Sequence, residues 1–280
     1  MIKETNKITK NNLDLSGLED NQLSIQLSLD GFSFCIYNRY TNCLDAFATY
    51  QFETTINSPQ HQLNLIKSIF ENEPLLNENY KNVIVSHCNN LVTQVPKPFF
   101  DKNNLENYLQ YTVKVLENDF IAFDEIDNTE IVNVYIPFVN INNFLLEKYG
   151  GFTYKHSSTI LIENLVRIYK NSNKQSCFVN VTNNWFEIVV VKNKKLELYN
   201  CFNFTTKEDF IYYILFVAEQ LKLNPEEFEL ILMGDIEKDS ELYTIAYNYI
   251  RNVDFYKPQN KSQLIKDVSP HSHFTLLNQY

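Results

Sequence analysis

The segment Gln22–Asn38 reads QLSIQLSLDGFSFCIYN and predicts a β-hairpin. Over Leu23–Leu29 every second residue is leucine or isoleucine, and serine or glutamine lies between them. This alternation is typical of a strand with one buried and one solvated face. Asp30-Gly31 is a strong hairpin-turn signal, and Phe32–Asn38 is expected to be the returning strand.

The residues that follow extend the hairpin to a unit of three strands, a helix and a fourth strand. Cys43–Phe52 is expected to be the third strand. Ser58-Pro59 supplies a helix cap followed by proline at the first helical position, and apolar residues at helical spacing over Leu63–Phe70 predict that helix. An apolar run inside Lys81–His87 then predicts a short buried strand.

The same order of elements recurs about 150 residues later. The expected parts are the strands Ser176–Thr182, Trp185–Val191 and Lys195–Asn203, the helix Phe210–Leu221 and the strand Phe228–Met233. Matching positions are offset by 153 residues (Gly31 to Asn184) or 147 residues (Ser58 to Thr205, Ile84 to Ile231). Such constant spacing predicts an internal duplication of a β-β-β-α-β unit.

An additional segment interrupts the first copy. Leu91–Val95, Asp119–Ile126 and Glu130–Phe138 resemble strands, and helices are expected to begin near Asp101 and Asn140, the second ending at two glycines. We therefore expect a polar N-terminal tail over 1–21, a first half over 22–88 and 151–172, an inserted β-α-β-β-α subdomain over 89–150, a second half over 173–257 and a C-terminal tail over 258–280. The apolar end of that last tail is expected to dock on an apolar surface.

The composition argues against several kinds of site. The chain of 280 residues has only 5 glycines, whereas average usage would give about 20. Neither the P-loop pattern nor the G-x-G-x-x-G dinucleotide pattern occurs. The net charge of −10 disfavours a nucleic-acid surface, and the densest basic run, Lys192–Lys195, lies at an expected hairpin tip.

The cysteines and the apolar runs indicate a cytoplasmic protein. There are 5 cysteines, an odd number, and none is in a C-x-x-C pattern, which suits a reducing compartment. The first ten residues carry no apolar segment of a signal peptide. The longest apolar run, Phe210–Ala218, is far short of the about 20 residues that span a bilayer.

The element order resembles the actin-like ATPase fold, an α/β fold in which two ribonuclease-H-like units follow one another. The insert resembles the extra subdomain of the cell-division protein FtsA and the type IV pilus assembly protein PilM, with Asn133–Phe138 and Tyr149–Phe152 at the passage out of it. Over residues 22–257 the chain is similar to an uncharacterised bacterial family, domain of unknown function 3822. The resemblance implies a nucleotide cleft between the halves and a subdomain that contacts other protein chains.

The resemblance also implies two phosphate loops of the form Asp-x-Gly and a pair of glycines on the adenosine side. The positions of this chain that match them, here called the candidate cleft residues, are Ser28, Asp30, Gly31, Ser33, Asn180, Thr182, Gly234 and Asp235. Serine and asparagine therefore replace the two aspartates that would hold Mg²⁺, and most of the glycines that admit phosphate are missing. We expect no catalytic residue and no cofactor, and a hairpin turn is the simpler explanation of Asp30-Gly31.

Other candidate sites have simpler structural explanations. His87 and Cys88 are adjacent on a strand, so their side chains point to opposite faces and cannot form a nucleophile–base pair. His271 and His273 lack a third ligand nearby in sequence, and no metal is expected. The acidic residues of segment 119–130 (Asp119, Asp124, Glu125, Asp127 and Glu130) suit a solvated hairpin edge. Trp185 either anchors an interface or packs against neighbouring strands.

These observations favour a non-catalytic, actin-like interaction or scaffold protein with a degenerate nucleotide cleft. One alternative is a divergent ATP-binding protein whose nucleotide gates partner binding, and a more distant one is a ribonuclease-H-like nuclease. We expect a protein partner or a further copy of the chain, no nucleic acid and no membrane insertion. The insert is the expected contact surface, because aromatic residues are favoured at interfaces and the insert is rich in them. The alternative is that these rings fill the insert's own core. The residues are Tyr108, Tyr111, Phe120, Phe123, Tyr135 and Tyr149.

Overall fold

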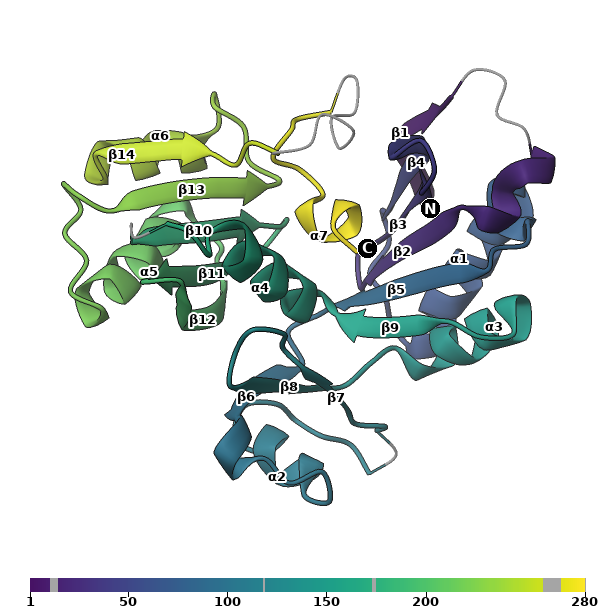
Figure 1. Cartoon of the computed structure of the whole chain (residues 1–280), viewed down its shortest axis with the longest axis horizontal. Coiled ribbons are helices and arrows are strands. Elements are labelled where there is room, and N and C mark those ends of the chain that lie inside the picture. The colour runs from purple at the N-terminus through teal and green to yellow at the C-terminus, as the bar shows by residue number, and fades with distance from the viewer. Residues whose placement is uncertain (11–14, 118, 173–174, 259–267, 280) are drawn as a thin grey trace. The chain divides into compact units, whose positions relative to one another are not determined.

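The computed structural model describes residues 1–10, 15–117, 119–172, 175–258 and 268–279. The chain forms two compact units, Met1–Ile160 together with Thr275–Tyr280, and Leu161–Phe274. Each unit is built on a β-sheet with helices packed against it (Figure 1).

The sheet of the first unit has six strands in the order β1-β4-β3-β2-β5-β9. These strands are β1 (Ile2–Thr9), β2 (Gln22–Ser28), β3 (Gly31–Asn38), β4 (Cys43–Phe52), β5 (Asn82–Cys88) and β9 (Thr153–His156). Neighbours from β1 to β2 are antiparallel, whereas β5 is parallel to both β2 and β9. The helical elements are η1 (Leu15–Asp20), α1 (Pro59–Asn72), η2 (Pro74–Asn77), α3 (Val139–Tyr149) and the start of α4 (Ser157–Ile168).

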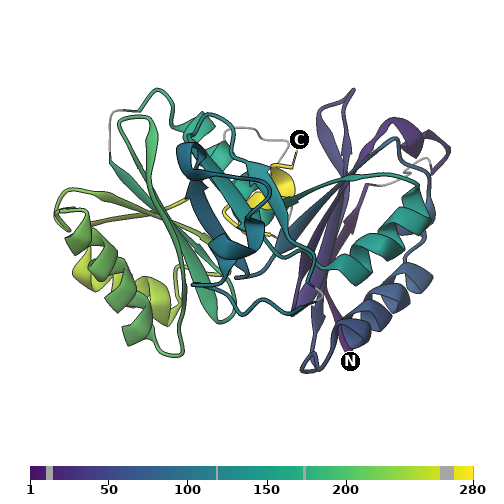
Figure 2. The same ribbon diagram turned by 90° about the horizontal axis from the view of Figure 1, so that it is seen from below.

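The apolar face of β2 forms the centre of the first core. Leu23 and Ile25 are fully buried, and they belong to one cluster with Ile66 of α1 and Leu145 of α3. Figure 2 shows α1 and α3 side by side on one face of the sheet. The Ser58 hydroxyl accepts the N–H of His61 at the start of α1, as the cap signal predicted.

The first residues form an edge strand instead of the expected loose tail. Ile2–Thr9 pairs with β4, and the hydroxyls of Thr5 and Thr49 lie 2.6 Å apart. Backbone pairing at an edge tolerates polar side chains on both faces, so this strand carries no alternation that could reveal it. Residues 11–14 of the expected N-terminal tail, and 259–267 of the expected C-terminal tail, lie outside the described residues.

The insert contributes a small sheet of order β6-β8-β7, formed by β6 (Val92–Pro96), β7 (Ala122–Glu125) and β8 (Ile131–Tyr135). With η3 (Lys97–Phe99) and α2 (Leu105–Leu109) it encloses a core of its own around Val134. Helix α3 was predicted to belong to the insert, but its Ile141 and Leu145 lie in the core of the main sheet. Its N-cap is Phe138, which makes no side-chain cap bond, and not Asn140.

The second unit repeats the pairing order in the sheet β12-β11-β10-β13-β14. Its elements are β10 (Ser176–Val181), β11 (Trp185–Lys192), β12 (Lys195–Asn203), α5 (Lys207–Gln220), β13 (Glu229–Gly234), α6 (Glu241–Tyr249) and β14 (Asn252–Phe255). Both sheets contain three antiparallel strands beside two parallel ones, and the first sheet has β1 as a fourth antiparallel strand at its edge. None of the helices in the described parts of the chain has the length and apolar character to cross a membrane.

The polar face of β2 is buried, contrary to the solvated face that its alternation predicted. Gln22 and Ser24 are exposed by only 0% and 2%. The last described residues, including most of the short helix α7 (Phe274–Leu277), cover this face (Figure 1). The C-terminal segment therefore docks as expected, but on a polar surface.

Candidate functional site

The candidate cleft residues of the first unit lie around the β2–β3 turn. The Ser28 hydroxyl donates to Asp30 Oδ1 at 2.7 Å and to the carbonyl of Gly31 at 3.2 Å. Gln62 of α1 donates its side-chain N–H to the Ser28 carbonyl at 2.8 Å. Ser33 lies within β3 and is not part of the turn. The structure thus brings together three of the four predicted residues.

Packing between strands explains the glycine at this turn. Gly31 is the first residue of β3 and has no positive φ, so the hairpin residues are Leu29 and Asp30, one position earlier than predicted. A Cβ atom on Gly31 would lie 2.7 Å from the carbonyl oxygen of Tyr50 on β4. The close approach of β4 requires glycine here whether or not a phosphate binds.

In the second unit, Asn180 of β10 lies opposite Glu187 of β11. The Asn180 amide donates to Glu187 Oε2 at 2.8 Å, and the Tyr199 hydroxyl donates to Oε1 at 2.8 Å. Burial raises the pKa of Glu187, and these two hydrogen bonds act in the opposite direction. A carboxylate is therefore present on the strand beside Asn180, but both of its oxygens are engaged by the protein.

Backbone N–H groups of the second-unit turns are also engaged. Thr182, Gly234 and Asp235 donate to carbonyls of the same unit at 2.9, 3.0 and 2.8 Å. The acceptor for Gly234 is His271 of the C-terminal segment. Gly234 has a φ of +84°, and a Cβ atom there would lie 2.1 Å from the carbonyl oxygen of Val181.

These contacts do not fit a magnesium–nucleotide ligand. A phosphate cradle needs N–H groups directed at the ligand, and Mg²⁺ prefers carboxylate and carbonyl oxygens. The first turn offers the exposed carboxylate of Asp30, whose charge would oppose that of a phosphate. The turns of the second unit donate their N–H groups to carbonyls of the same unit. We therefore derive no nucleotide chemistry from either unit.

A groove of about 540 Å³ lies within the first unit, where the main sheet meets the insert. Mostly apolar residues from five short segments line it: Leu29, Ile56, Asn57, Ser58, Pro59, Gln62, Leu91, Asp119, Phe120, Ile136, Pro137, Phe138, Val139, Asn140 and Ile141. Leu29 and Phe120 are 52% and 53% exposed. The single charged lining residue, Asp119, accepts the N–H of Leu116 at 2.8 Å. A groove of this size and character suits apolar side chains of a bound segment.

Two residues at the end of β5 hold the walls of this groove. His87 Nδ1 accepts the N–H of Phe138 at 3.2 Å, and burial lowers the pKa of His87 to about 3, so the ring stays neutral and able to accept. The Asn89 amide donates to the Ile136 carbonyl at 3.0 Å and accepts the N–H of Leu91 at 2.8 Å. The groove is therefore held in shape by buried hydrogen bonds, a form of preorganisation.

Asp124 is buried, unlike Glu125, Asp127 and Glu130 of the same acidic segment, which are exposed as expected for a solvated edge. Its Oδ2 accepts the backbone N–H of His156 at 2.7 Å and the Thr159 hydroxyl at 2.8 Å, and Tyr135 donates to Oδ1 at 3.1 Å. Burial raises the pKa of Asp124. His156 Nε2 lies 3.1 Å from the carbonyl of Asn89, so this cluster also supports the groove wall.

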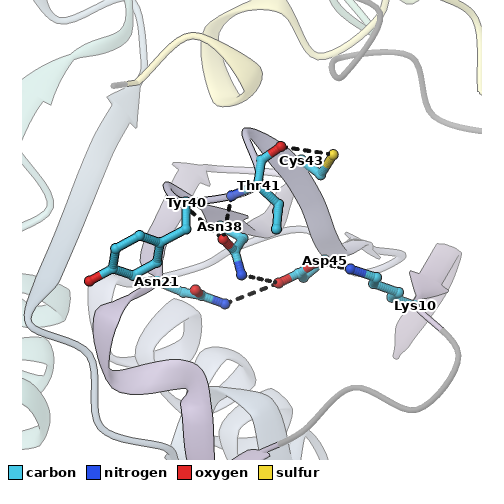
Figure 3. Close-up of polar contacts among 7 residues, drawn as sticks. All are labelled: Lys10, Asn21, Asn38, Tyr40, Thr41, Cys43 and Asp45. Atoms are coloured by element: carbon cyan, nitrogen blue, oxygen red, sulfur yellow. Dashed lines mark hydrogen bonds and ion pairs between the residues drawn. The ribbon is translucent and has the colours of Figure 1, made fainter.

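Another buried carboxylate, that of Asp45, connects the strands at one end of the main sheet (Figure 3). Asn21 and Asn38 donate to its Oδ2 at 3.1 and 3.2 Å, and Lys10 Nζ lies 3.3 Å from Oδ1. The carboxylate joins residues at the ends of four strands. Because three donors of the chain surround it, we assign Asp45 a structural role.

The remaining candidates also have structural surroundings. His271 contacts the Ile236 carbonyl at 2.6 Å and its ring lies tilted against that of Phe255, and burial lowers the pKa of His273 to about 4. Trp185 is half-buried at the start of β11. Within the described ranges, no group of three or more His, Cys, Asp or Glu side chains is placed to hold a metal.

The aromatic residues of the insert divide between its core and its surface. Tyr135 is fully buried and Tyr108 stacks on a neighbouring ring. Tyr111, Phe120 and Phe123 are exposed by 85%, 53% and 40%. Of these three, only Phe120 lines the groove.

Comparison with known proteins identifies the family. The family described as "Protein of unknown function (DUF3822)" matches residues 10–253. The chain belongs to this family. The DUF3822 protein is similar to a Bacteroides thetaiotaomicron VPI-5482 protein with an actin-like ATPase fold and unknown function, at 25% identity and a TM-score of 0.79 over 87% of this chain and 93% of that one. No curated protein matches it.

Two further solved structures share the fold. The PilM-PilN type IV pilus biogenesis complex is 13% identical, with a TM-score of 0.60 over 92% of this chain and 97% of that one. The ethanolamine utilization protein EutJ from Carboxydothermus hydrogenoformans is 8% identical, with a TM-score of 0.50 over 97% and 93%. The DUF3822 protein therefore has the actin-like ATPase fold that its element order indicated.

Sequence reasoning missed the groove and the buried acids Asp45 and Glu187. The groove draws on residues from position 29 to position 141, and no local pattern connects them. Glu187 had a detectable signal, since it stands among apolar residues in a strand that reads as buried. A carboxylate in such a strand must be hydrogen-bonded when the protein folds.

Proposed function

We propose that this DUF3822 protein is a non-catalytic, actin-like interaction module whose first unit binds a segment of a partner protein in the groove. One contrast carries the proposal. In the second unit the backbone N–H groups of the matching turns are engaged by carbonyls, and in the first unit the matching turn presents the carboxylate of Asp30. The groove, in contrast, is largely apolar and is held in shape by His87 and Asn89.

The chemistry of the groove supports a protein ligand. Its lining offers apolar side chains and carries one charge, so it provides little to orient a phosphate or a sugar. The partly exposed Leu29 and Phe120 would lose water-accessible apolar area on binding. PilM, which shares the fold, has been solved together with PilN, so a protein of this fold can assemble with another protein.

Site-specific photo-crosslinking in the native cells tests the groove. A benzophenone amino acid at position 120 should capture one defined protein, and Leu29→Asp should abolish that adduct because it places a charge in the groove. The matched control is the same amino acid at position 99, since Phe99 is 76% exposed on the insert but does not line the groove. Equal capture from both positions would contradict the proposal.

Thermal denaturation with Mg-ATP tests the absence of nucleotide binding. A ligand at 100 times its Kd stabilises the folded state by about 2.7 kcal/mol. We expect no shift of the midpoint at millimolar Mg-ATP. A shift of several degrees, or phosphate release above that of a heat-inactivated sample, would favour the ATP-binding alternative.

A further inference from the structure

The polar face of the main sheet in the first unit has the character of a recognition surface. It is formed by Gln22, Ser24 and Gln26 of β2 and by Ser86 of β5. Gln22, Ser24 and Ser86 are at most 2% exposed, and none of the four side chains is charged. Solvated strand faces usually carry charges, whereas a buried uncharged polar face needs hydrogen-bonding partners.

The last described residues of the chain supply those partners. The Thr275 hydroxyl donates to Gln26 Oε1 at 2.6 Å. The Gln279 amide donates to Ser86 Oγ at 2.6 Å and to the Ile25 carbonyl at 3.3 Å, and the Gln279 carbonyl accepts from Gln22 at 3.2 Å. The side chains and the backbone of the segment are therefore both recognised.

The interior of the segment is equally enclosed. All residues from Thr275 to Gln279 are at most 7% exposed. The Cys35 thiol contacts the Leu276 carbonyl at 3.8 Å. The face thus binds a short, uncharged peptide in which two leucines lie between polar residues, and the link to residue 274 keeps that peptide within reach.

One hydrogen bond between the segment and the face is missing, which affects how tightly the segment is held. Within the described residues, the buried side-chain oxygen of Gln279 has no hydrogen-bond partner. A buried acceptor without a donor costs free energy, so the segment is held less tightly than full complementarity would allow. Covalent tethering offsets this loss, because it raises the effective concentration of the segment at the face.

We propose that this face is a peptide-binding site for the C-terminal segment, and that it accepts the same segment from a second copy of the chain. Site and ligand belong to one chain, so every copy carries both halves of the interaction. Within one chain, the tethered segment competes with that of its neighbour. A variant in which the tethered segment binds the face less tightly should therefore bind an added peptide more tightly.

A labelled peptide of residues 269–280, SPHSHFTLLNQY, titrated onto the full-length chain by fluorescence anisotropy, tests the proposal. The chain variant Gln279→Ala loses the two bonds of the amide and should bind the native peptide at least tenfold more tightly than the wild-type chain does. The peptide that itself carries Gln279→Ala should not bind.

Paired serine variants separate recognition from general destabilisation. Adding Ser86→Ala to the Gln279→Ala chain should remove the gain in affinity, since Ser86 accepts the Gln279 amide of the peptide. Adding Ser176→Ala should leave it unchanged, because Ser176 is an equally buried serine of the second unit whose hydroxyl has no partner within the described residues. Equal binding to wild-type and Gln279→Ala chains, or binding insensitive to Ser86→Ala, would overturn the proposal.

Discussion

Replacing Gly234 with alanine should lower the free energy of unfolding of the second unit by about 4 kcal/mol. A non-glycine residue at the observed φ of +84° costs about 1–2 kcal/mol. The added Cβ would also lie 2.1 Å from the backbone oxygen of Val181, and forced overpacking costs about 1–3 kcal/mol. That oxygen accepts the N–H of Asp235, so moving it weakens a hydrogen bond worth about 1 kcal/mol.

Two other glycines separate these contributions. Gly150 has a φ of +73°, and a Cβ atom added there would have no neighbouring atom within 4 Å, so Gly150→Ala should cost only about 1 kcal/mol. Gly151 has neither a positive φ nor a close neighbour, and Gly151→Ala should change stability by less than about 1 kcal/mol in either direction. The three variants thus compare close packing plus backbone strain, backbone strain alone, and neither.

Urea denaturation followed by circular dichroism measures the three effects, with an unchanged m-value as evidence that the transition itself is the same. The result matters for function, because the sequence resemblance places Gly234 at one glycine of the adenosine-side motif. If Gly234→Ala cost no more than Gly150→Ala, close packing would not explain this glycine. A ligand-binding reason for it would then have to be considered again.

Two further predictions concern buried titratable side chains. Burial lowers the pKa values of His87 and His156 from 6.5 to about 3. Below pH 6.5 the unfolded state therefore binds more protons than the folded state. The free energy of unfolding should fall by about 1.4 kcal/mol per pH unit per histidine between pH 6 and 4. The raised pKa values of Asp124 and Glu187 act in the opposite direction. The variant His87→Asn should reduce the slope of the free energy of unfolding against pH, measured by urea denaturation. An unchanged slope would show that His87 is not responsible. Asp45→Asn should cost about 3 kcal/mol because it leaves Lys10 and two amides without their carboxylate, whereas Asp20→Asn, at an exposed pair with Lys81, should cost less than about 1 kcal/mol. Similar losses for these two variants in urea denaturation would refute the structural role of Asp45.

Local chemistry in the sequence determined the elements of both sheets. The alternation over 22–29, the cap at Ser58 and the constant offsets predicted the strands and helices of the repeated unit, and the structure has them in the same order. These signals are local, because strand alternation, capping and turn preferences depend on residues a few positions apart. In the second copy the boundary is displaced, since a capping box of Thr206 and Asp209 opens α5 at Lys207, three residues before the predicted start at Phe210.

The predictions that failed concern what covers each surface. Alternation distinguished the two faces of β2 but could not say that residues 275–279 cover the polar one. The uncharged character of Gln22, Ser24 and Gln26 was the available signal, because a solvated face would be expected to carry lysine or glutamate. The polar residues of β1 gave no signal, since an edge strand is held mainly by its backbone.

The candidate binding sites depend on contacts between residues far apart in the chain. Leu29, Phe120 and Phe138 meet in one groove, and Gln279 meets Ser86, although nothing in their local sequences connects them. The sequence by itself therefore determined the order of strands and helices in the two sheets, and with it the α/β class of the fold. The groove and the peptide-covered face were decided only in the tertiary structure, because cavities and buried hydrogen bonds arise from the packing of separate elements and not from the pattern within any one of them.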